Sequence, residues 1–226
     1  MFDTLLLLPL FQGLTIEDLT EIIEKAKLNF VKHKPKALFI ESEQPCKDLT
    51  FVLRGTFSKT TTEKDGLYSV IETIEGPYLI EPQSLYGMTT HYTSSYTAID
   101  EVHTVSISKA FINTLLMQYD IFRINYINIV CNRSQTLNNY IWSTIDNSLD
   151  ARIAHFINIH CERKSGEKTI KIKMDDLANI LNDTRTNISR ILNNLQNKGV
   201  VELRRGEIFI FDLGILNQTI EELKSK

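Results

Sequence analysis

Residues 174–195 read MDDLANILNDTRTNISRILNNL, and they give the clearest indication of how the C-terminal part of the chain folds. Asp175 favours the start of a first helix, because carboxylates are stabilised near the positive end of a helix dipole. Asn182-Asp183 predicts a tight turn, and Thr184 is a good N-cap for a second helix. Two helices joined by a short turn are typical of a helix-turn-helix.

The second helix has one apolar and one polar face. The expected core positions of the two helices are Leu177, Ala178, Leu181, Ile188, Ile191, Leu192 and Leu195. Gly199 suits the position just after the second helix, and residues 200–210 predict a β-hairpin that turns at Arg205-Gly206. Helix, turn, helix and wing in this order predict a DNA-binding domain. An ordinary helix pair with a solvated face is the alternative.

The outer face of the second helix carries the side chains that a recognition helix presents to base edges and phosphates. Arg185 and Arg190 can each donate two parallel hydrogen bonds to a guanine or hold a phosphate. Arg204 and Arg205 near the wing tip would meet the DNA backbone. The expected DNA-binding residues are Lys173, Asp175, Thr184, Arg185, Thr186, Asn187, Ser189, Arg190, Arg204 and Arg205.

The N-terminal part has a different pattern of hydrophobic and turn-forming residues. Residues 15–27 predict a short amphipathic helix with Thr15 as its N-cap. Short β-rich runs then alternate with Pro, Gly and Asp turns, which predicts an antiparallel sandwich or jelly roll. The expected strands are 28–31, 37–40, 49–53, 68–74, 96–99 and 102–107.

Residues 109–143 contain no Gly or Pro and predict one long helix. Two overlapping stripes at helical spacing make its apolar face broad enough to contact both its own β-domain and a second copy of the chain. A helix buried wholly within its own chain is the alternative. The expected dimer contacts are Ile124, Ile127, Val130, Cys131, Ser134, Leu137 and Ile141. A further helix over 147–164 and a strand over 169–172 lead into the helix-turn-helix.

Composition limits the class of protein. With 226 residues, 42% hydrophobic and 23% charged, the chain is expected to be a soluble, cytoplasmic protein of two domains. No run approaches the ~20 apolar residues of a membrane span, and the apolar N-terminus lacks the basic start of a signal peptide. Residues 1–149 hold 12 Lys/Arg and 17 Asp/Glu, a charge of −5, whereas residues 150–226 hold 13 and 11, a charge of +2. Three cysteines that lie far apart in the sequence argue against a disulfide framework, and they cannot supply the four thiolates of a usual iron–sulfur cluster.

The sequence resembles the CRP/FNR family of bacterial transcription regulators over nearly its whole length. The resemblance is carried by PLFQGL at 9–14, FIE at 39–41, LTFVLRG at 49–55, LDARIA at 149–154 and TRTNISRIL at 184–192. It implies an α+β fold with a cyclic-nucleotide-binding-type β-roll over 1–108, a dimerisation helix over 109–146 and a winged helix-turn-helix over 147–226. It also implies a homodimer on inverted-repeat double-stranded DNA, with RNA polymerase as a partner.

Two departures from the family pattern concern cyclic AMP. A cyclic-nucleotide roll carries a Gly-Glu pair and an Arg-Ser or Arg-Thr pair, but residues 81–87 and 91–98 contain neither pair. No arginine lies between Gly55 and Gln118, and burying an unpaired phosphate charge is costly. We therefore expect no cyclic AMP binding.

In the recognition helix, Thr186 replaces the Glu that is common in this family, so the preferred DNA half-site should differ from that of family members with this Glu.

The texture of residues 85–88 and 95–98 is similar to the HcpR-like branch of the family, which is associated with nitrosative stress and haem. Haem would need a His or Met axial ligand in an apolar pocket, and Met88, His91 and His103 are the candidates. A lone Met or His in a β-roll is more often a packing or surface residue than a haem ligand. The candidate effector-binding residues are Gln83, Tyr86, Met88, Tyr92, Thr93 and Thr136.

Two alternatives to an effector-controlled regulator stay open. In the first, the roll is only a dimer scaffold and the regulator needs no effector. In the second, the jelly roll is a metal-dependent enzyme, which would need several histidines converging in the roll. Only His91 and His103 lie within it, and the chain lacks the usual nucleophile, phosphate-loop and zinc motifs. We do not expect an enzyme.

Overall fold

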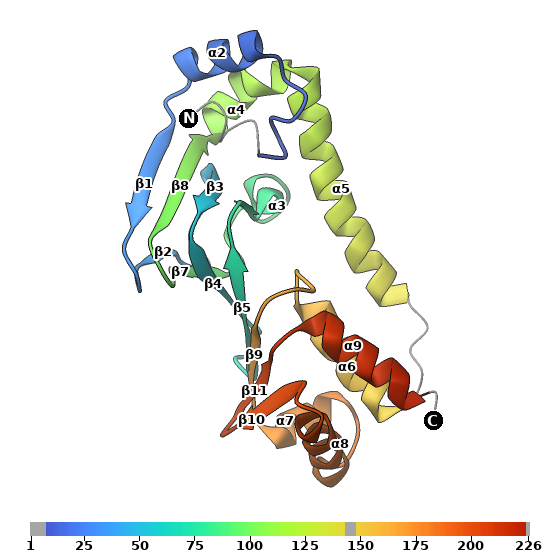
Figure 1. Cartoon of the computed structure of the whole chain (residues 1–226). Coiled ribbons are helices and arrows are strands. Elements are labelled where there is room, and N and C mark those ends of the chain that lie inside the picture. The colour runs from blue at the N-terminus through green and yellow to red at the C-terminus, as the bar shows by residue number, and fades with distance from the viewer. Residues whose placement is uncertain (1–7, 143–147, 225–226) are drawn as a thin grey trace. The chain divides into compact units, whose positions relative to one another are not determined.

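The computed structural model describes residues 8–142 and 148–224, and the chain forms two compact units (Figure 1). The first unit comprises residues 1–58 and 74–136, and the second comprises 59–73 and 137–226. The domain boundaries expected at 108 and 146 stay a prediction; in this division, residues 59–73 group with the C-terminal part. None of the helices within residues 8–142 and 148–224 has the length and hydropathy of a membrane span.

The first unit is an antiparallel β-sandwich, as expected. One sheet has the order β1 (Asn29–His33), β8 (Val102–Ser108), β3 (Asp48–Arg54) and β6 (Tyr78–Ile80), and the other face includes β2 (Leu38–Ile40), β7 (Ser95–Ala98) and the start of β4 (Thr56–Thr62). The core between them is built from buried aromatic and aliphatic side chains such as Phe51, Phe57 and Tyr96. Neither β4 nor β6 was among the expected strands.

Short helices flank the sandwich. In α2 (Ile16–Lys25), Thr15 is the N-cap and forms a reciprocal capping box with Asp18, so the predicted helix start is confirmed. Leu19 and Ile22 bury its apolar face. The four-residue helix α3 (Pro82–Leu85) follows β6 and was not expected.

The prediction of a single helix over 109–143 is wrong, and residue 143 itself lies outside the described residues. The described residues form α4 (Lys109–Thr114), a 3-10 turn (Leu116–Gln118) and α5 (Asp120–Trp142). Tyr119 has an extended backbone, which ends one helical segment and allows the next to start. The break lets Leu116 and Phe122 both lie fully buried in the sandwich core, so tertiary packing overrides the local helix propensity.

The second unit contains the helix-turn-helix. Its elements are α6 (Leu149–His160), β9 (Lys168–Ile172), α7 (Met174–Ile180), α8 (Arg185–Asn197), β10 (Val201–Arg204), β11 (Glu207–Ile210) and α9 (Leu213–Lys224). The predicted wing, formed by β10 and β11, is confirmed. The helix expected over 147–164 ends at His160, because the backbone N–H groups of Glu162 and Arg163 turn to the carboxylate of Glu72 at 2.9 and 3.2 Å. Residue 147 lies outside the described residues.

A hairpin from an earlier part of the chain completes this unit. β5 (Tyr68–Glu75) pairs antiparallel with β9 through five residue pairs, from Tyr68 with Ile172 to Glu72 with Lys168. Val70 is buried in the same core as the helix-turn-helix. The fit is close at Gly166 (φ +83°), where a Cβ atom would lie 2.9 Å from the carbonyl oxygen of Thr73. Alanine at this position would therefore be strained in both backbone and contact.

Candidate nucleic-acid interface

The turn between α7 and α8 has the geometry that the sequence predicts. Asn182 adopts a left-handed backbone with φ +49°, which Asn tolerates better than most residues. The hydroxyl of Thr184 accepts the backbone N–H of Asn187 at 3.3 Å, so the predicted N-cap of α8 is confirmed. At the other end of α8, Gly199 has φ +71°, as expected for the residue after a helix.

A contact from α6 holds this turn. The guanidinium of Arg152 donates to the carbonyl oxygen of Leu181 and, at 2.6 Å, to the carboxylate of Asp183. The other oxygen of Asp183 accepts the side-chain amide of Asn187 and the backbone N–H of Thr184, both at 2.8 Å. The bond from Asn187, with those from Thr184 and Arg152, lowers the pKa of Asp183 below its ordinary 3.8. Asp183 therefore links α6, the turn and the first turn of α8.

The two faces of α8 are clearly separated. Ile188, Ile191, Leu192 and Leu195 are buried, as expected, and Arg185, Thr186 and Arg190 are exposed. The guanidinium of Arg185 lies 3.3 Å from the carboxylate of Asp175 in α7. In the described part of the chain, Arg190 has no hydrogen bond or ion pair, so its donors are free for a ligand.

The wing carries a second pair of arginines. Arg204 makes a bidentate contact with Glu202 at 3.0 and 3.1 Å and stacks over the ring of Phe209 at 4.8 Å. This contact lowers the pKa of Glu202. Arg205 is exposed at the turn, and no partner for it occurs within the described residues.

The ten expected DNA-binding residues thus lie on three segments: the start of α7, the turn with the start of α8, and the wing. Lys173 is exposed at the start of α7, and Ser189 is half-buried on α8. The contact of all ten with DNA stays a prediction.

The sequence analysis missed Arg152. Its hydrogen-bond partners lie about 30 residues away in the sequence, so no local sequence pattern indicates its role.

The six candidate effector residues do not share one set of contacts. Gln83 accepts a hydrogen bond from Arg133 of α5 at 2.7 Å, and the hydroxyl of Tyr86 donates to Asn113. The hydroxyl of Tyr92 donates to the carbonyl oxygen of Asp48, and the backbone N–H of Thr93 donates to Glu81. Thr136 bonds within α5, and Met88 is completely exposed. Their role in binding an effector stays a prediction.

Two of the three candidate haem ligands are not placed as axial ligands, and a role of His91 stays a prediction. A ligand atom must be free and lie in an apolar pocket. Met88 lies wholly in solvent, and the Nε2 atom of His103 is engaged by Arg54 and Glu101 at 2.9 and 2.6 Å. His91 is half-buried, and its backbone forms an isolated β-bridge with Pro45. Within the described residues, no group of three His, Cys, Asp or Glu is arranged for a metal ion.

The three cysteines are free and differ in burial. Cys46 and Cys161 are buried, whereas Cys131 is exposed on α5. Burial raises the pKa of the Cys161 thiol to about 12 and also raises that of Cys46. Both buried thiols are therefore protonated and poor nucleophiles at neutral pH.

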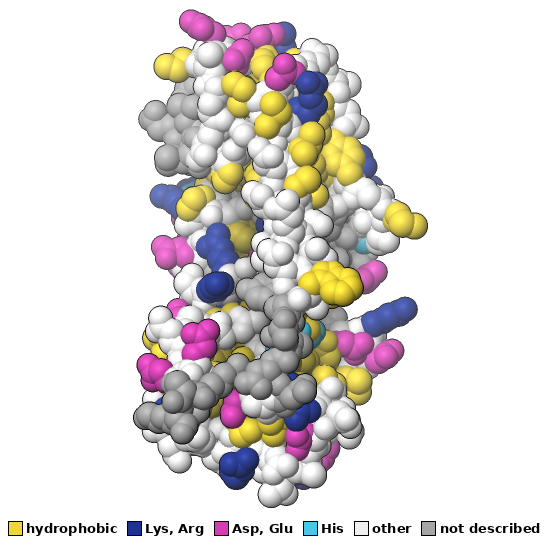
Figure 2. Space-filling model, turned by 90° about the vertical axis from the view of Figure 1, so that its right-hand side faces the viewer, with side chains coloured by type: hydrophobic (Ala, Val, Ile, Leu, Met, Phe, Trp, Pro, Cys, Tyr) yellow, Lys and Arg dark blue, Asp and Glu magenta, His cyan; other side chains and the backbone are white. Residues whose placement is uncertain are grey.

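Part of α5 presents apolar side chains to solvent. Ile124, Ile127, Leu137 and Ile141 are 53%, 52%, 55% and 68% exposed, and Cys131 and Ser134 are also exposed. Val130 is instead partly buried against the sandwich core. Figure 2 shows hydrophobic side chains over this helix.

Comparison with known proteins identifies the C-terminal domain. Residues 151–219 match the Crp-like helix-turn-helix domain family, so this part of the chain is a Crp-like helix-turn-helix domain. No curated protein matches the sequence.

Solved structures show the fold of the whole chain. A putative transcriptional regulator of the CRP/FNR family from Eubacterium rectale is 19% identical and has a TM-score of 0.54, covering 95% of this chain and 98% of its own. The catabolite activator protein of Thermus thermophilus is 15% identical, with a TM-score of 0.50 and coverage of 96% and 100%. The sensor domain of the regulator DNR from Pseudomonas aeruginosa is 14% identical, with a TM-score of 0.50 and coverage of 65% and 99%. The chain therefore has the fold of a CRP/FNR-type regulator: a β-sandwich of cyclic-nucleotide-binding type followed by a Crp-like helix-turn-helix.

Proposed function

We propose that this protein is a homodimeric transcription regulator of the CRP/FNR family that binds specific DNA sequences in the cytoplasm. The main support is the structure of α8. It is a capped helix whose inner face is buried, and Arg185, Thr186 and Arg190 are exposed in its N-terminal half. A helix in this setting can enter the major groove, where arginine distinguishes guanine by two parallel hydrogen bonds. RNA polymerase is the expected partner of such a regulator at a promoter.

The exposed apolar face of α5 supports the homodimer. Ile124, Ile127 and Ile141 are each more than half exposed, and a monomer would leave this apolar surface in water. Two copies related by a two-fold axis would present their recognition helices to two half-sites about one helical turn apart. The expected operator is therefore an inverted repeat.

Two observations support a roll that does not bind cyclic AMP. No arginine occurs between residues 55 and 118, and Glu81 places a buried carboxylate between α3 and β7. A cyclic phosphate in this part of the roll would meet a negative charge at low dielectric, which is unfavourable. Arg133, which reaches α3 from α5, already bonds Gln83 and the carbonyl oxygen of Leu79.

A second candidate is a regulator that needs no small-molecule effector. Buried Glu81 favours it, because the chain itself satisfies the hydrogen-bond donors at the junction of α3 and β7. DNA binding by protein purified without added ligand would support this candidate.

The proposal is tested by selecting duplexes that the full-length protein binds from a random pool and by measuring its native mass. We expect one enriched inverted repeat and a mass of two chains. Failure to enrich any sequence would overturn the assignment as a sequence-specific regulator.

A further inference from the structure

Glu81 is a buried acid in an unusual backbone position. It follows β6 and precedes α3, and its exposed fraction is 2%. Its backbone is left-handed, with φ +33° and ψ 59°. Left-handed backbone is unfavourable for a side chain such as Glu, so the surrounding structure must compensate for it.

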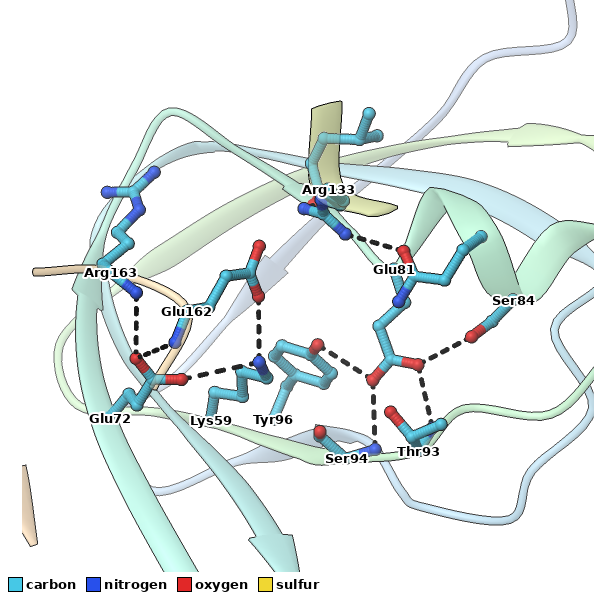
Figure 3. A network of polar contacts seen from close by, with 12 residues as sticks. Lys59, Glu72, Glu81, Ser84, Thr93, Ser94, Tyr96, Arg133, Glu162 and Arg163 are labelled. Carbon is cyan, nitrogen blue, oxygen red and sulfur yellow. Dashed lines mark hydrogen bonds and ion pairs between the residues drawn. The ribbon is translucent and has the colours of Figure 1, made fainter. Parts of the chain in front are cut away.

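The compensation comes from four hydrogen bonds to the carboxylate (Figure 3). Oε2 accepts the hydroxyl of Ser84 and the backbone N–H of Thr93, both at 2.8 Å. Oε1 accepts the backbone N–H of Ser94 and the hydroxyl of Tyr96, both at 3.0 Å. Two donors for each oxygen satisfy the carboxylate in the way that a bound anion is satisfied.

The donors are neutral and come from two segments. Ser84 belongs to α3, whereas Thr93, Ser94 and Tyr96 lie at or beside the start of β7. Within the described residues, no Lys, Arg or His nitrogen lies within ion-pair distance of Glu81. Without the carboxylate, the buried hydroxyl of Ser84 would lose the acceptor of its hydrogen bond, which is costly.

We propose that the junction of α3 and β7 is a carboxylate-binding site that the chain fills with its own Glu81. The site takes a small monocarboxylate group, and Glu81 is a tethered ligand that holds α3 against the start of β7 without a free effector. The consequence for regulation rests on the proposed function: a free anionic effector cannot take this position while Glu81 occupies it, so DNA binding does not depend on one.

Chemical rescue tests the site directly. In the full-length variant Glu81→Gly, the carboxylate is removed and the new residue suits the left-handed backbone. We expect this variant to unfold at a lower temperature than the wild type in chloride. Formate or acetate at the same ionic strength should raise its unfolding temperature saturably, by about 3–6 °C at ten times the dissociation constant. The wild type should not respond.

Two matched variants separate the site from general effects. Glu43 also has a left-handed backbone, with φ +66°, but its side chain is exposed, so Glu43→Gly should show no rescue. Glu81→Gln fills the site with an amide whose N–H groups face other donors, so it should be destabilised and also not rescued. A rescue of equal size in Glu43→Gly would overturn the proposal.

The interpretation also depends on whether the variant Glu81→Gly folds in chloride. If Glu81→Gly does not fold in chloride, refolding in formate should recover folded protein, and failure in both salts would overturn the proposal. A folded variant that responds no more to formate or acetate than to chloride would also overturn it. Because the readout is unfolding, rescue without any DNA binding would contradict only the proposed function.

Discussion

The guanidinium of Arg152 in α6 lies 2.6 Å from the carboxylate of Asp183, at the turn that precedes the recognition helix. Both side chains are largely shielded from solvent. Asp183 also accepts a hydrogen bond from the side-chain amide of Asn187, in the first turn of α8. The orientation of α8 on the second unit is thereby set by a charged contact as well as by the apolar core. Loss of this contact should change the DNA-binding surface without exposing the core.

The Asp183 carboxylate predicts a defined pH dependence. Because hydrogen bonds lower its pKa below 3.8, its stabilising effect is present in full above pH 3.8 and is lost as the pH falls through the lowered pKa. Asp183→Asn should therefore unfold at a lower temperature than the wild type at neutral pH, and the difference should shrink in acid. Thermal unfolding across this range checks it, with the exposed Asp65→Asn as control. A difference that persists unchanged in strong acid would contradict the explanation.

Glu72 and Lys168 predict a large effect on stability. Their side chains are 2% and 0% exposed and lie 3.7 Å apart, where β5 pairs with β9. Lys59 and Glu162 extend the network from Glu72 (Figure 3). Glu72→Gln leaves a buried lysine without its main counter-charge and should cost about 3–5 kcal/mol of unfolding free energy. Adding Lys168→Met should recover much of the loss.

The pair Lys171 and Glu207, which is much less buried, provides the control for this experiment. Their nitrogen and oxygen lie 3.4 Å apart, and their side chains are 51% and 30% exposed. Glu207→Gln should cost less than about 1 kcal/mol. Denaturant unfolding of the full chain measures both variants, and similar small losses would show that β5 is not an integral strand of the second unit.

Two carboxylates should compete with DNA for the arginines of the interface. Asp175 holds Arg185 at 3.3 Å, and Glu202 holds Arg204 through two hydrogen bonds. Asp175→Asn or Glu202→Gln should free the arginine for phosphate and raise DNA affinity up to about fivefold. For Asp175 this outcome would mean that it restrains Arg185 and does not contact DNA itself, against the expectation from the sequence. Titration of labelled duplex measures the change, with Glu17→Gln on α2 as control. Weaker binding by both variants would show that these pairs position the arginines for DNA.

The apolar face of α5 predicts the effect of a buried charge. Ile127→Asp or Ile141→Asp would place two charges in the interface of a symmetric dimer and should shift the protein to monomer at micromolar concentration. Ile16→Asp is a matched control, because Ile16 is 72% exposed on α2. Sedimentation or native mass measures the state. Wild-type protein that is monomeric under these conditions would contradict the dimer.

The helix-turn-helix was predictable because its signals are local. The cap at Thr184, the turn at Asn182 and the stop at Gly199 are each set by one residue and its neighbours. The buried face of α8 follows from simple periodicity. All of these features were confirmed.

Features set by distant contacts were not predictable. The break at Tyr119 depends on the burial of Leu116 and Phe122, and the polar, threonine-rich β4 lacks the alternation typical of a strand. The site around Glu81 was missed because Thr93, Ser94 and Tyr96 lie 12 to 15 residues away, and a lone Glu before Pro82 gives no sign of burial. The pairing of β5 with β9 joins segments about 100 residues apart.

A comparison of Arg190→Ala with Arg205→Ala shows whether α8 distinguishes DNA sequences. Binding is titrated on the selected operator and on a scrambled duplex at several salt concentrations. Arg190→Ala should cost about 1–3 kcal/mol on the operator and flatten discrimination at one base pair per half-site. Arg205→Ala should weaken both duplexes alike and lower the salt dependence by about one phosphate contact per half-site. Equal weakening of both duplexes by Arg190→Ala would contradict the account.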